Sequence, residues 1–362
     1  MLKAFNIWLP AYLRQRRATW DESREKHLII CVCDHFEPFH DASRAEGLSR
    51  VHRWADEFPA LSEAWHDSGG EPFRRTFFYP IEQYDEEVLA ALAELCGTTH
   101  CETEIHLHHK NDTAENMAAT LERGKEKLAR HGLLSTDPSG ALCFGFIHGN
   151  WALDNSDPHG RNCGVRNELR VLQEAGCYAD FTMPSAPHPT QTETINSIYY
   201  ATPTDRPKSH NHGTPARAGV ADPGGMLLVQ GPLGLNWRWR KWGFLPRVEN
   251  GDLTPRNPPT INRLRLWLEL NVHVQGRPEW VFAKLHTHGG TPRNMEMLLG
   301  EQKKGFHDAL PQFAEKHANF HYHYVTAREL VNIVHAAEAG MAGDPGGFRD
   351  FRYTSRLCPP VT

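Results

Sequence analysis

The sequence predicts an α/β protein built as a (β/α) barrel of about seven parallel strands, a distorted relative of the TIM barrel, with one irregular insertion. Two observations lead to this prediction. Short apolar segments typical of buried strands alternate with longer segments of helical periodicity along most of the chain. Several of the apolar segments also end in histidine or aspartate, and in a parallel barrel such ends converge on one mouth.

The strand candidates are short apolar or aromatic runs bounded by polar and turn-forming residues. The first, at 27–34, is continuously apolar until it closes at Asp34, as expected for a strand buried on both faces. The third carries His106 and His108. The remaining candidates cover residues 73–79, 141–148, 178–182, 225–230, 280–285 and 321–325.

Helical periodicity follows most of these strands. The clearest helix is predicted at 85–97, because Asp85 can cap its first turn and Glu86 and Glu87 lie at the positive end of its dipole. Gly97 is expected to end this helix. Further helices are predicted at 48–65, 113–131, 165–175 and 327–339.

The predicted barrel covers residues 27–340 of the 362, between an N-terminal arm at 1–26 and a C-terminal tail at 341–362. The alternation breaks at about 203–259, which is dense in Pro, Gly and Trp, so we expect an irregular functional insertion there. Its aromatic and cationic residues could form a wall that stacks on sugars or contacts anions, or could seal the insertion onto the barrel. They are Trp237, Arg238, Trp239, Arg240, Lys241 and Trp242.

Composition excludes several classes of protein. A net charge of −5 and a pI near 6.5 argue against nucleic acid as a partner, since no basic face is implied. The eight cysteines include no Cys-x-x-Cys pair, which argues against a zinc ribbon and favours a reducing compartment. No segment reaches transmembrane length, and we expect a cytoplasmic protein.

The N-terminal arm is apolar at first and then basic at Arg14, Arg16 and Arg17. It lacks the apolar core and cleavage site of a signal peptide, and Pro10 interrupts it. Two interpretations stay open. The arm packs on the domain, or it forms an amphipathic anchor at the anionic inner face of a membrane.

Residues 104–112 read Glu-Ile-His-Leu-His-His-Lys-Asn-Asp. In a strand, His106 and His108 point to the same face. If a helix follows, Asp112 lies one turn beyond His108 and can approach it. An imidazole and a carboxylate on one face make half of a divalent-metal site. The alternative is a polar loop in a chain that holds 23 histidines.

Other strand ends supply matching groups. Asp34 and His35 follow the first strand, and His286 and His288 follow the strand at 280–285. A metal with an open coordination position polarises a carbonyl group and lowers the pKa of a bound water. A neighbouring carboxylate can then accept the proton of that water, and a histidine can protonate the leaving group. Amide hydrolysis needs this combination.

In order and spacing, these motifs resemble those of the polysaccharide deacetylase (NodB-homology) family over most of the chain. The resemblance implies that Asp34 is the catalytic base and that His35 stands where the family has a ligand aspartate. It implies that His108 binds the metal and that Asp112 replaces a second ligand histidine. His286, preceded by leucine as in the family's last motif, is the implied general acid.

The chain also departs from the family pattern. A related pattern that spaces the two acids apart leaves Asp34 or Glu37 open as a metal ligand. The family's Arg-x-Pro-Tyr motif is matched only by residues 148–151, which lack the arginine, and Arg166 is a candidate replacement. Asp180 is expected to orient His286. Substrate contacts are expected from His148, Asn150, Trp151, Asp180 and His288.

The resemblance implies a hydrolase that uses a divalent metal, most simply zinc, to remove an N- or O-acyl group from an amino sugar or glycan precursor. One alternative is a barrel that binds carbohydrate without turnover. Another is an amidohydrolase-type enzyme, suggested by the His-x-His pairs at 106–108 and 286–288. A glycosidase would need two opposed carboxylates, for which only Asp34 and Asp180 offer themselves.

Overall fold

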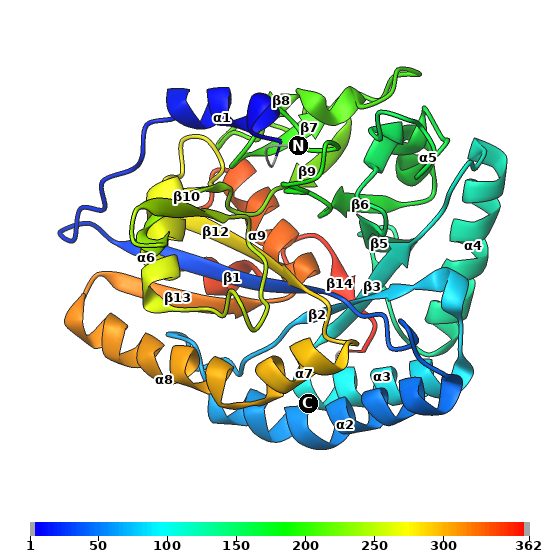
Figure 1. The fold of residues 1–362 in the computed structure, drawn as a ribbon, viewed down its shortest axis with the longest axis horizontal. Coiled ribbons are helices and arrows are strands. Elements are labelled where there is room, and N and C mark those ends of the chain that lie inside the picture. The colour runs from blue at the N-terminus through cyan, green and yellow to red at the C-terminus, as the bar shows by residue number, and fades with distance from the viewer. Residues whose placement is uncertain (1–3, 358–362) are drawn as a thin grey trace.

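The computed structural model describes residues 4–357, apart from the side chains of residues 301–303. Residues 1–3 of the predicted arm and 358–362 of the predicted tail lie outside the described residues. The fold is mixed α/β, with a largely parallel central sheet and helices between its strands (Figure 1). The predicted α/β class is therefore confirmed.

Within the described chain, twelve strands form the central sheet and two form a separate hairpin, β10–β11. The strands are β1 (Lys26–His35), β2 (Thr76–Pro80), β3 (Glu102–Leu107), β4 (Ser135–Thr136), β5 (Leu142–His148), β6 (Cys177–Asp180), β7 (Ile198–Ala201), β8 (Thr214–Pro215), β9 (Met226–Val229), β10 (Gly234–Lys241), β11 (Leu245–Glu249), β12 (Trp280–Thr287), β13 (Phe320–Val325) and β14 (Thr354–Ser355). Each predicted strand is present, although the second begins at Thr76 rather than at residue 73.

The strand order is β12-β1-β2-β3-β5-β6-β9-β7-β8, and β13 pairs with the first part of β1. Neighbours from β12 through β9 run parallel, whereas β7 is antiparallel to β9. Parallel strands share their carboxyl edge. Cys33 pairs with His286, and Leu107 pairs with His148, so the polar ends of β1, β12, β3 and β5 lie along one edge of the sheet.

Helices connect the strands, and α2, α3, α7 and α8 lie side by side along one side of the sheet (Figure 1). The helices are α1 (Phe5–Arg14), α2 (Arg44–Ala64), α3 (Glu86–Thr99), α4 (Ala114–Arg130), α5 (Glu168–Glu174), α6 (Ile261–Leu270), α7 (Pro292–Leu299), α8 (Glu301–Lys316) and α9 (Ala327–Glu338), with short 3-10 turns η1 (Ile81–Gln83), η2 (Leu153–Asn155), η3 (Ser209–Asn211) and η4 (Pro345–Phe348).

The predicted cap of α3 is confirmed, and its predicted end is wrong. Asp85 accepts hydrogen bonds from the backbone N–H groups of Glu87 and Val88 at 3.1 and 3.2 Å. The helix passes through Gly97 and ends where His100 adopts the left-handed conformation, with φ of 55°. Glycine lowers helix stability without breaking the hydrogen-bond ladder, so its presence alone does not stop the helix.

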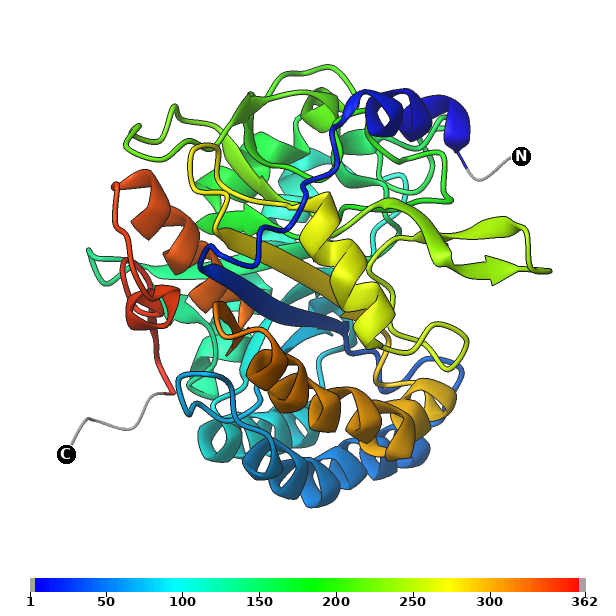
Figure 2. The same ribbon diagram turned by 90° about the vertical axis from the view of Figure 1, so that its left-hand side faces the viewer.

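The region predicted as an irregular insertion holds β8 to β11, and β9 lies inside the central sheet. The hairpin β10–β11 projects from the body (Figure 2). At the N-terminus, Trp8 and Tyr12 of α1 pack against Ala186, Ile195 and Leu233, which supports the interpretation of the arm as packed on the domain. Among the described residues, no helix combines the length and the apolarity needed to cross a bilayer.

Candidate metal centre

Three side chains meet where β1 and β3 end, and we call Glu37, His106 and His108 the mouth cluster. One potential ligand atom from each lies within 4.8 Å of the others. Glu37 Oε1 is 2.7 Å from His108 Nε2 and 3.4 Å from His106 Nε2. Side chains alternate between the two faces along β3, and His108, one residue past its end, continues this alternation on the same face as His106. The turn after β1 carries Glu37 toward them.

The mouth cluster has the polar chemistry of a metal site. His106 is fully buried, its Nδ1 has no hydrogen-bond partner, and its Nε2 has only the long 3.4 Å contact with Glu37 Oε1. Buried polar atoms without a partner are uncommon and costly, and a bound cation would satisfy one of them. On the far side of His108, Nδ1 lies 2.7 Å from Glu82 Oε1. A carboxylate in this position fixes the tautomer that leaves Nε2 free to bind a metal.

The ionisation of Glu37 and that of His108 at the mouth cluster depend on each other. Burial disfavours the His108 cation, but its hydrogen bonds to Glu37 and Glu82 outweigh burial and raise the pKa of His108 to about 9. Burial also opposes ionisation of Glu37, yet hydrogen bonds from His106 and His108 lower the pKa of Glu37 overall. Glu37 is therefore an anion and an available ligand at neutral pH.

Three further histidines surround this cluster. The ring of His35 lies 4.9 Å from that of His106, 4.7 Å from that of His288 and 5.9 Å from that of His286, measured between centroids. His35 Nδ1 is buried without a hydrogen-bond partner. The structure thus brings the predicted His35, His108, His286 and His288 into one neighbourhood.

Asp34 is fully buried behind the cluster. It forms an ion pair with Arg75, and its Oδ1 accepts the backbone N–H of Gly289 at 2.5 Å. Arg75 also lies over the Trp54 ring, 4.3 Å from its centroid. Arg166, the candidate replacement for the family's arginine beside the catalytic base Asp34, is exposed. Arg75 holds Asp34 instead, from the segment that precedes β2.

Asp112 does not approach His108 as the sequence predicts. Its Oδ2 lies 3.3 Å from His109 Nδ1, and its Oδ1 accepts a hydrogen bond from Asn116 at 2.6 Å. The predicted helical spacing fails because Asn111 adopts a left-handed conformation, with φ of 48°, and α4 begins only at Ala114. The structure therefore corrects the predicted ligand pair of His108 and Asp112.

A cleft of about 880 Å³ opens above the mouth cluster. The predicted residues Asn150, Trp151 and His288 line it. His148 does not, because it is fully buried beside His109. Asp180 is also buried, and both of its oxygens accept hydrogen bonds from Thr182, so it does not take the predicted role of orienting His286. Residues not predicted from the sequence complete the lining: His40, Glu82, Gln83, Gly149, His188, Thr291 and Asn294.

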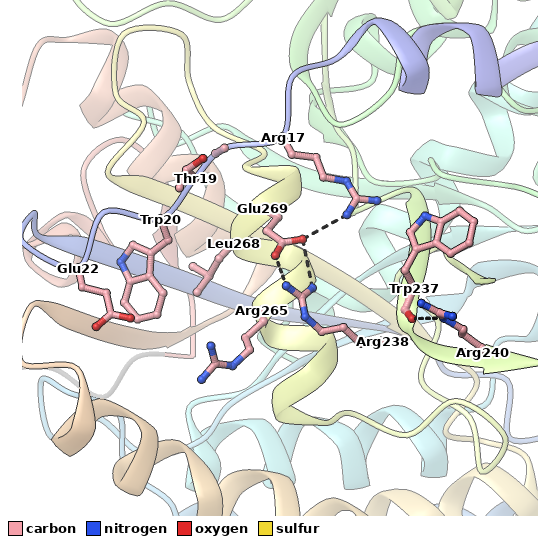
Figure 3. A pocket seen from close by; sticks show the side chains of 11 residues that line it. Arg17, Thr19, Trp20, Glu22, Trp237, Arg238, Arg240, Arg265, Leu268 and Glu269 are labelled. Atoms are coloured by element: carbon pink, nitrogen blue, oxygen red, sulfur yellow. Dashed lines mark hydrogen bonds and ion pairs between the residues drawn. The ribbon is translucent and has the colours of Figure 1, made fainter. Parts of the chain in front are cut away.

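The tryptophan-rich segment at 237–242 lies outside the candidate metal centre. Figure 3 shows Arg17 and Arg238 converging on Glu269 beside Trp237, in a groove of about 610 Å³. Trp237 and Trp242 are 47% and 79% exposed, so they do not seal the insertion onto the body. They are absent from the lining of the cleft above the mouth cluster, which separates this aromatic wall from the candidate centre.

Comparison with known proteins adds no assignment. No family model matches the chain, and no curated protein matches it.

Proposed function

We propose that the protein is a metal-dependent hydrolase that removes an N- or O-acyl group from an amino sugar or a related glycan precursor. The observation that carries the proposal is the mouth cluster at the base of an open cleft, with a buried carboxylate and further imidazoles beside it. A metal alone would indicate a binding site. The adjacent acid and base candidates favour hydrolysis.

Glu37, His106 and His108 are the proposed ligands, and His35 lies beside them, with its ring centroid 4.9 Å from that of His106 and 4.7 Å from that of His288. Two imidazoles and a carboxylate suit zinc, with one position left open. When bound, such an ion lowers the pKa of a water molecule and polarises the acyl carbonyl. Glu82 holds His108 in the ligating tautomer through the contact at Nδ1.

Asp34 is the proposed base. Arg75 and the Gly289 N–H each take one of its oxygens, and each carboxylate oxygen keeps a second lone pair that can accept a proton from water. His286, from the neighbouring strand β12, is the proposed donor to the leaving atom. In the reaction, the water oxygen bonds to the acyl carbon, the bond from that carbon to nitrogen or oxygen breaks, and the leaving atom gains the proton.

The cleft suits a sugar ring. Trp151 and His188 form one wall, with ring centroids 6.1 Å apart, and aromatic faces bind the apolar faces of sugars. Asn150, Thr291 and Asn294 line the same cleft and offer donors and acceptors for hydroxyl groups.

The proposal includes a distorted (β/α) barrel. Lys284 Nζ, from β12, donates to the carbonyl oxygen of Phe181, directly after β6, at 2.7 Å. The chain after β9 also approaches β12, since a Cβ atom at Gly231 would overlap the carbonyl oxygen of Lys284. These contacts bring the β6–β9 end of the parallel array close to β12, at its other end, which supports a closed arrangement.

The proposal is tested by metal analysis of the purified protein, together with a screen of N- and O-acetylated amino sugars for released acetate. We expect one divalent ion at the mouth cluster and acetate release that Glu37→Gln abolishes together with that ion. Asp34→Asn should abolish release while the metal stays bound. Glu86→Gln, on the exposed face of α3, is the matched control. A protein without a divalent ion at the mouth cluster, or a fully active Asp34→Asn variant, would overturn the proposal.

A further inference from the structure

A second group of potential ligands lies behind the cleft wall, and we call His109, His148, Cys163 and Glu168 the buried cluster. All four residues are buried, and their potential ligand atoms lie within 4.8 Å of one another. They come from four places: the turn after β3, the last residue of β5, the loop after η2 and the first residue of α5. The proposed hydrolase uses none of them.

We propose that the buried cluster is a structural metal site that holds one zinc ion. The donors surround Glu168. Its Oε1 is 3.0 Å from His109 Nε2 and 3.8 Å from His148 Nε2. Its Oε2 accepts from Cys163 Sγ at 3.3 Å. Ligands in a tetrahedral zinc site lie roughly 3.3–3.8 Å apart, as follows from zinc–ligand bonds of about 2.0–2.3 Å, so small shifts would complete the coordination.

The charges of the donors also fit. A thiolate, a carboxylate and two neutral imidazoles carry two negative charges in all, which a divalent ion cancels. Neutrality matters here because a buried net charge is costly. Without an ion, His148 Nε2 is fully buried and has no hydrogen-bond partner. A Cys, His and carboxylate set with every position taken by protein is typical of a structural rather than a catalytic zinc site.

Residues around the buried cluster orient the donors. Asp112 Oδ2 lies 3.3 Å from His109 Nδ1, which is the arrangement that turns the opposite nitrogen toward a metal. The backbone N–H of Val165 donates to Cys163 Sγ at 3.4 Å and would stabilise its thiolate. Asn150 N–H donates to His148 Nδ1 at 3.1 Å. Metal binding through Nε2 puts a proton on Nδ1, so the Asn150 N–H must turn away from His148 when the ion binds.

An ion bound at the buried cluster would stabilise one wall of the cleft. Between β5 and α5 the chain runs through a long segment whose only helical element is the short η2, and long segments of this kind need other constraints to stay ordered. Asn150 and Trp151 begin this segment and line the cleft. An ion that joins His148 to Cys163 and Glu168 would fix both ends of the segment to β3 and β5.

The inference is tested by cobalt substitution of the full chain after chelation. Thiolate bound to cobalt gives a near-ultraviolet charge-transfer band, and the mouth cluster contains no cysteine, so the band reports the buried cluster alone. We expect the band in the wild type and in His108→Ala. It should disappear in Cys163→Ser and persist in Cys177→Ser, a buried thiol outside the cluster. Zinc content should fall by one equivalent in Cys163→Ser relative to Cys177→Ser.

A wild-type protein without the band overturns the inference, and so does a band that survives in Cys163→Ser. If Cys163→Ser does not fold, the wild type and His108→Ala decide the question, since both keep the buried cluster intact. Loss of the mouth-cluster metal in His108→Ala together with a retained band supports the buried site whether or not the hydrolase proposal holds.

Discussion

Asp34 Oδ1 accepts the backbone N–H of Gly289 at 2.5 Å, although the two residues are 255 positions apart. The contact joins the ends of β1 and β12. It depends on glycine, because a Cβ atom at Gly289 would overlap Asp34 Oδ2 and meet the Trp54 ring at 3.0 Å. At Gly290, a Cβ atom would overlap the backbone of Glu37. The two glycines after His288 therefore let the two strand ends that carry the candidate centre approach each other.

Gly289→Ala should destabilise the protein, because the new methyl group has no space without movement of Asp34 or Trp54. Overpacking of this kind costs about 1–3 kcal/mol, and chemical denaturation measures it. Gly97→Ala is the control. It lies in α3 with nothing within 4 Å of the added Cβ, so it should be neutral or stabilising by up to about 1 kcal/mol. Equal stabilities of the two variants would contradict the argument.

Arg75→Met should be strongly destabilising, because it leaves Asp34 buried without its cation. Breaking a buried ion pair by removing one partner costs about 3–5 kcal/mol. The double variant Asp34→Asn/Arg75→Met should cost less than the two single variants added together, since neither charge is then left alone. Arg24→Met, which removes an exposed pair with Asp21, should change stability by less than about 1 kcal/mol. Additive effects of the two buried substitutions would show that the pair is not coupled.

Glu82→Gln should weaken metal binding at the mouth cluster without abolishing it. Glu82 contacts His108 only at Nδ1, and loss of such an outer partner typically lowers metal affinity 10–100-fold. Gly149→Ala should have a similar effect, because a Cβ atom there would overlap the His108 ring. Competition with a chelating dye measures both affinities. Unchanged affinity in both variants would exclude His108 as a ligand.

The sequence predicts the strands and the gathering of their polar ends, because buried parallel strands are visible as apolar runs and their carboxyl ends share an edge. It does not predict which side chains meet beyond those ends. Glu37 lies two residues past β1, where the direction of the chain depends on a turn rather than on strand alternation. The sequence-based prediction places Asp112 wrongly for the same reason, since the left-handed conformation of Asn111 breaks the helical spacing assumed between His108 and Asp112.

Some helices show too little helical periodicity in the sequence to be predicted from it. The sequence-based prediction contains no helix over α7 and α8, and α8 carries Gly305 and Pro311 inside it. Both residues lower helix propensity, and tertiary packing overrides them. The arginine that holds Asp34 was equally hard to foresee, because Arg75 lies before β2 and becomes a partner only when β1 and β2 pair.

Trp151→Ala should raise KM for an acylated sugar more than it lowers kcat, since Trp151 lines the cleft and contacts no proposed reacting group. Loss of one aromatic face should cost roughly 1.4 kcal/mol, which corresponds to about tenfold in KM. Trp242→Ala, at a side chain that is 79% exposed and outside the cleft lining, should leave KM unchanged. Steady-state kinetics distinguish these outcomes. An unchanged KM in Trp151→Ala would remove this residue from the substrate site.

Asp180→Asn should stabilise the protein more at pH 8 than at pH 5. Burial raises the pKa of Asp180 to about 7, even though hydrogen bonds from Thr182 favour the anion. The unfolded chain ionises near its ordinary pKa of about 3.9. Above pH 7 both states are ionised, and the folded state bears the full cost of a buried anion. As the pH falls from 7 toward 4, only the folded state takes up a proton, so that cost declines by at most roughly 1.4 kcal/mol per pH unit.

The asparagine variant has no such proton uptake and keeps an acceptor for the Thr182 N–H. Its stability relative to the wild type, measured by urea denaturation, should therefore rise between pH 5 and pH 8. Asp137→Asn is the matched control, because this carboxylate is exposed and the pKa of Asp137 is lowered by hydrogen bonds from Ser139. That group is ionised in both states throughout this range, so its substitution should leave the pH dependence unchanged. Parallel stability profiles for wild type and Asp180→Asn would mean that Asp180 stays ionised in the folded protein at pH 5.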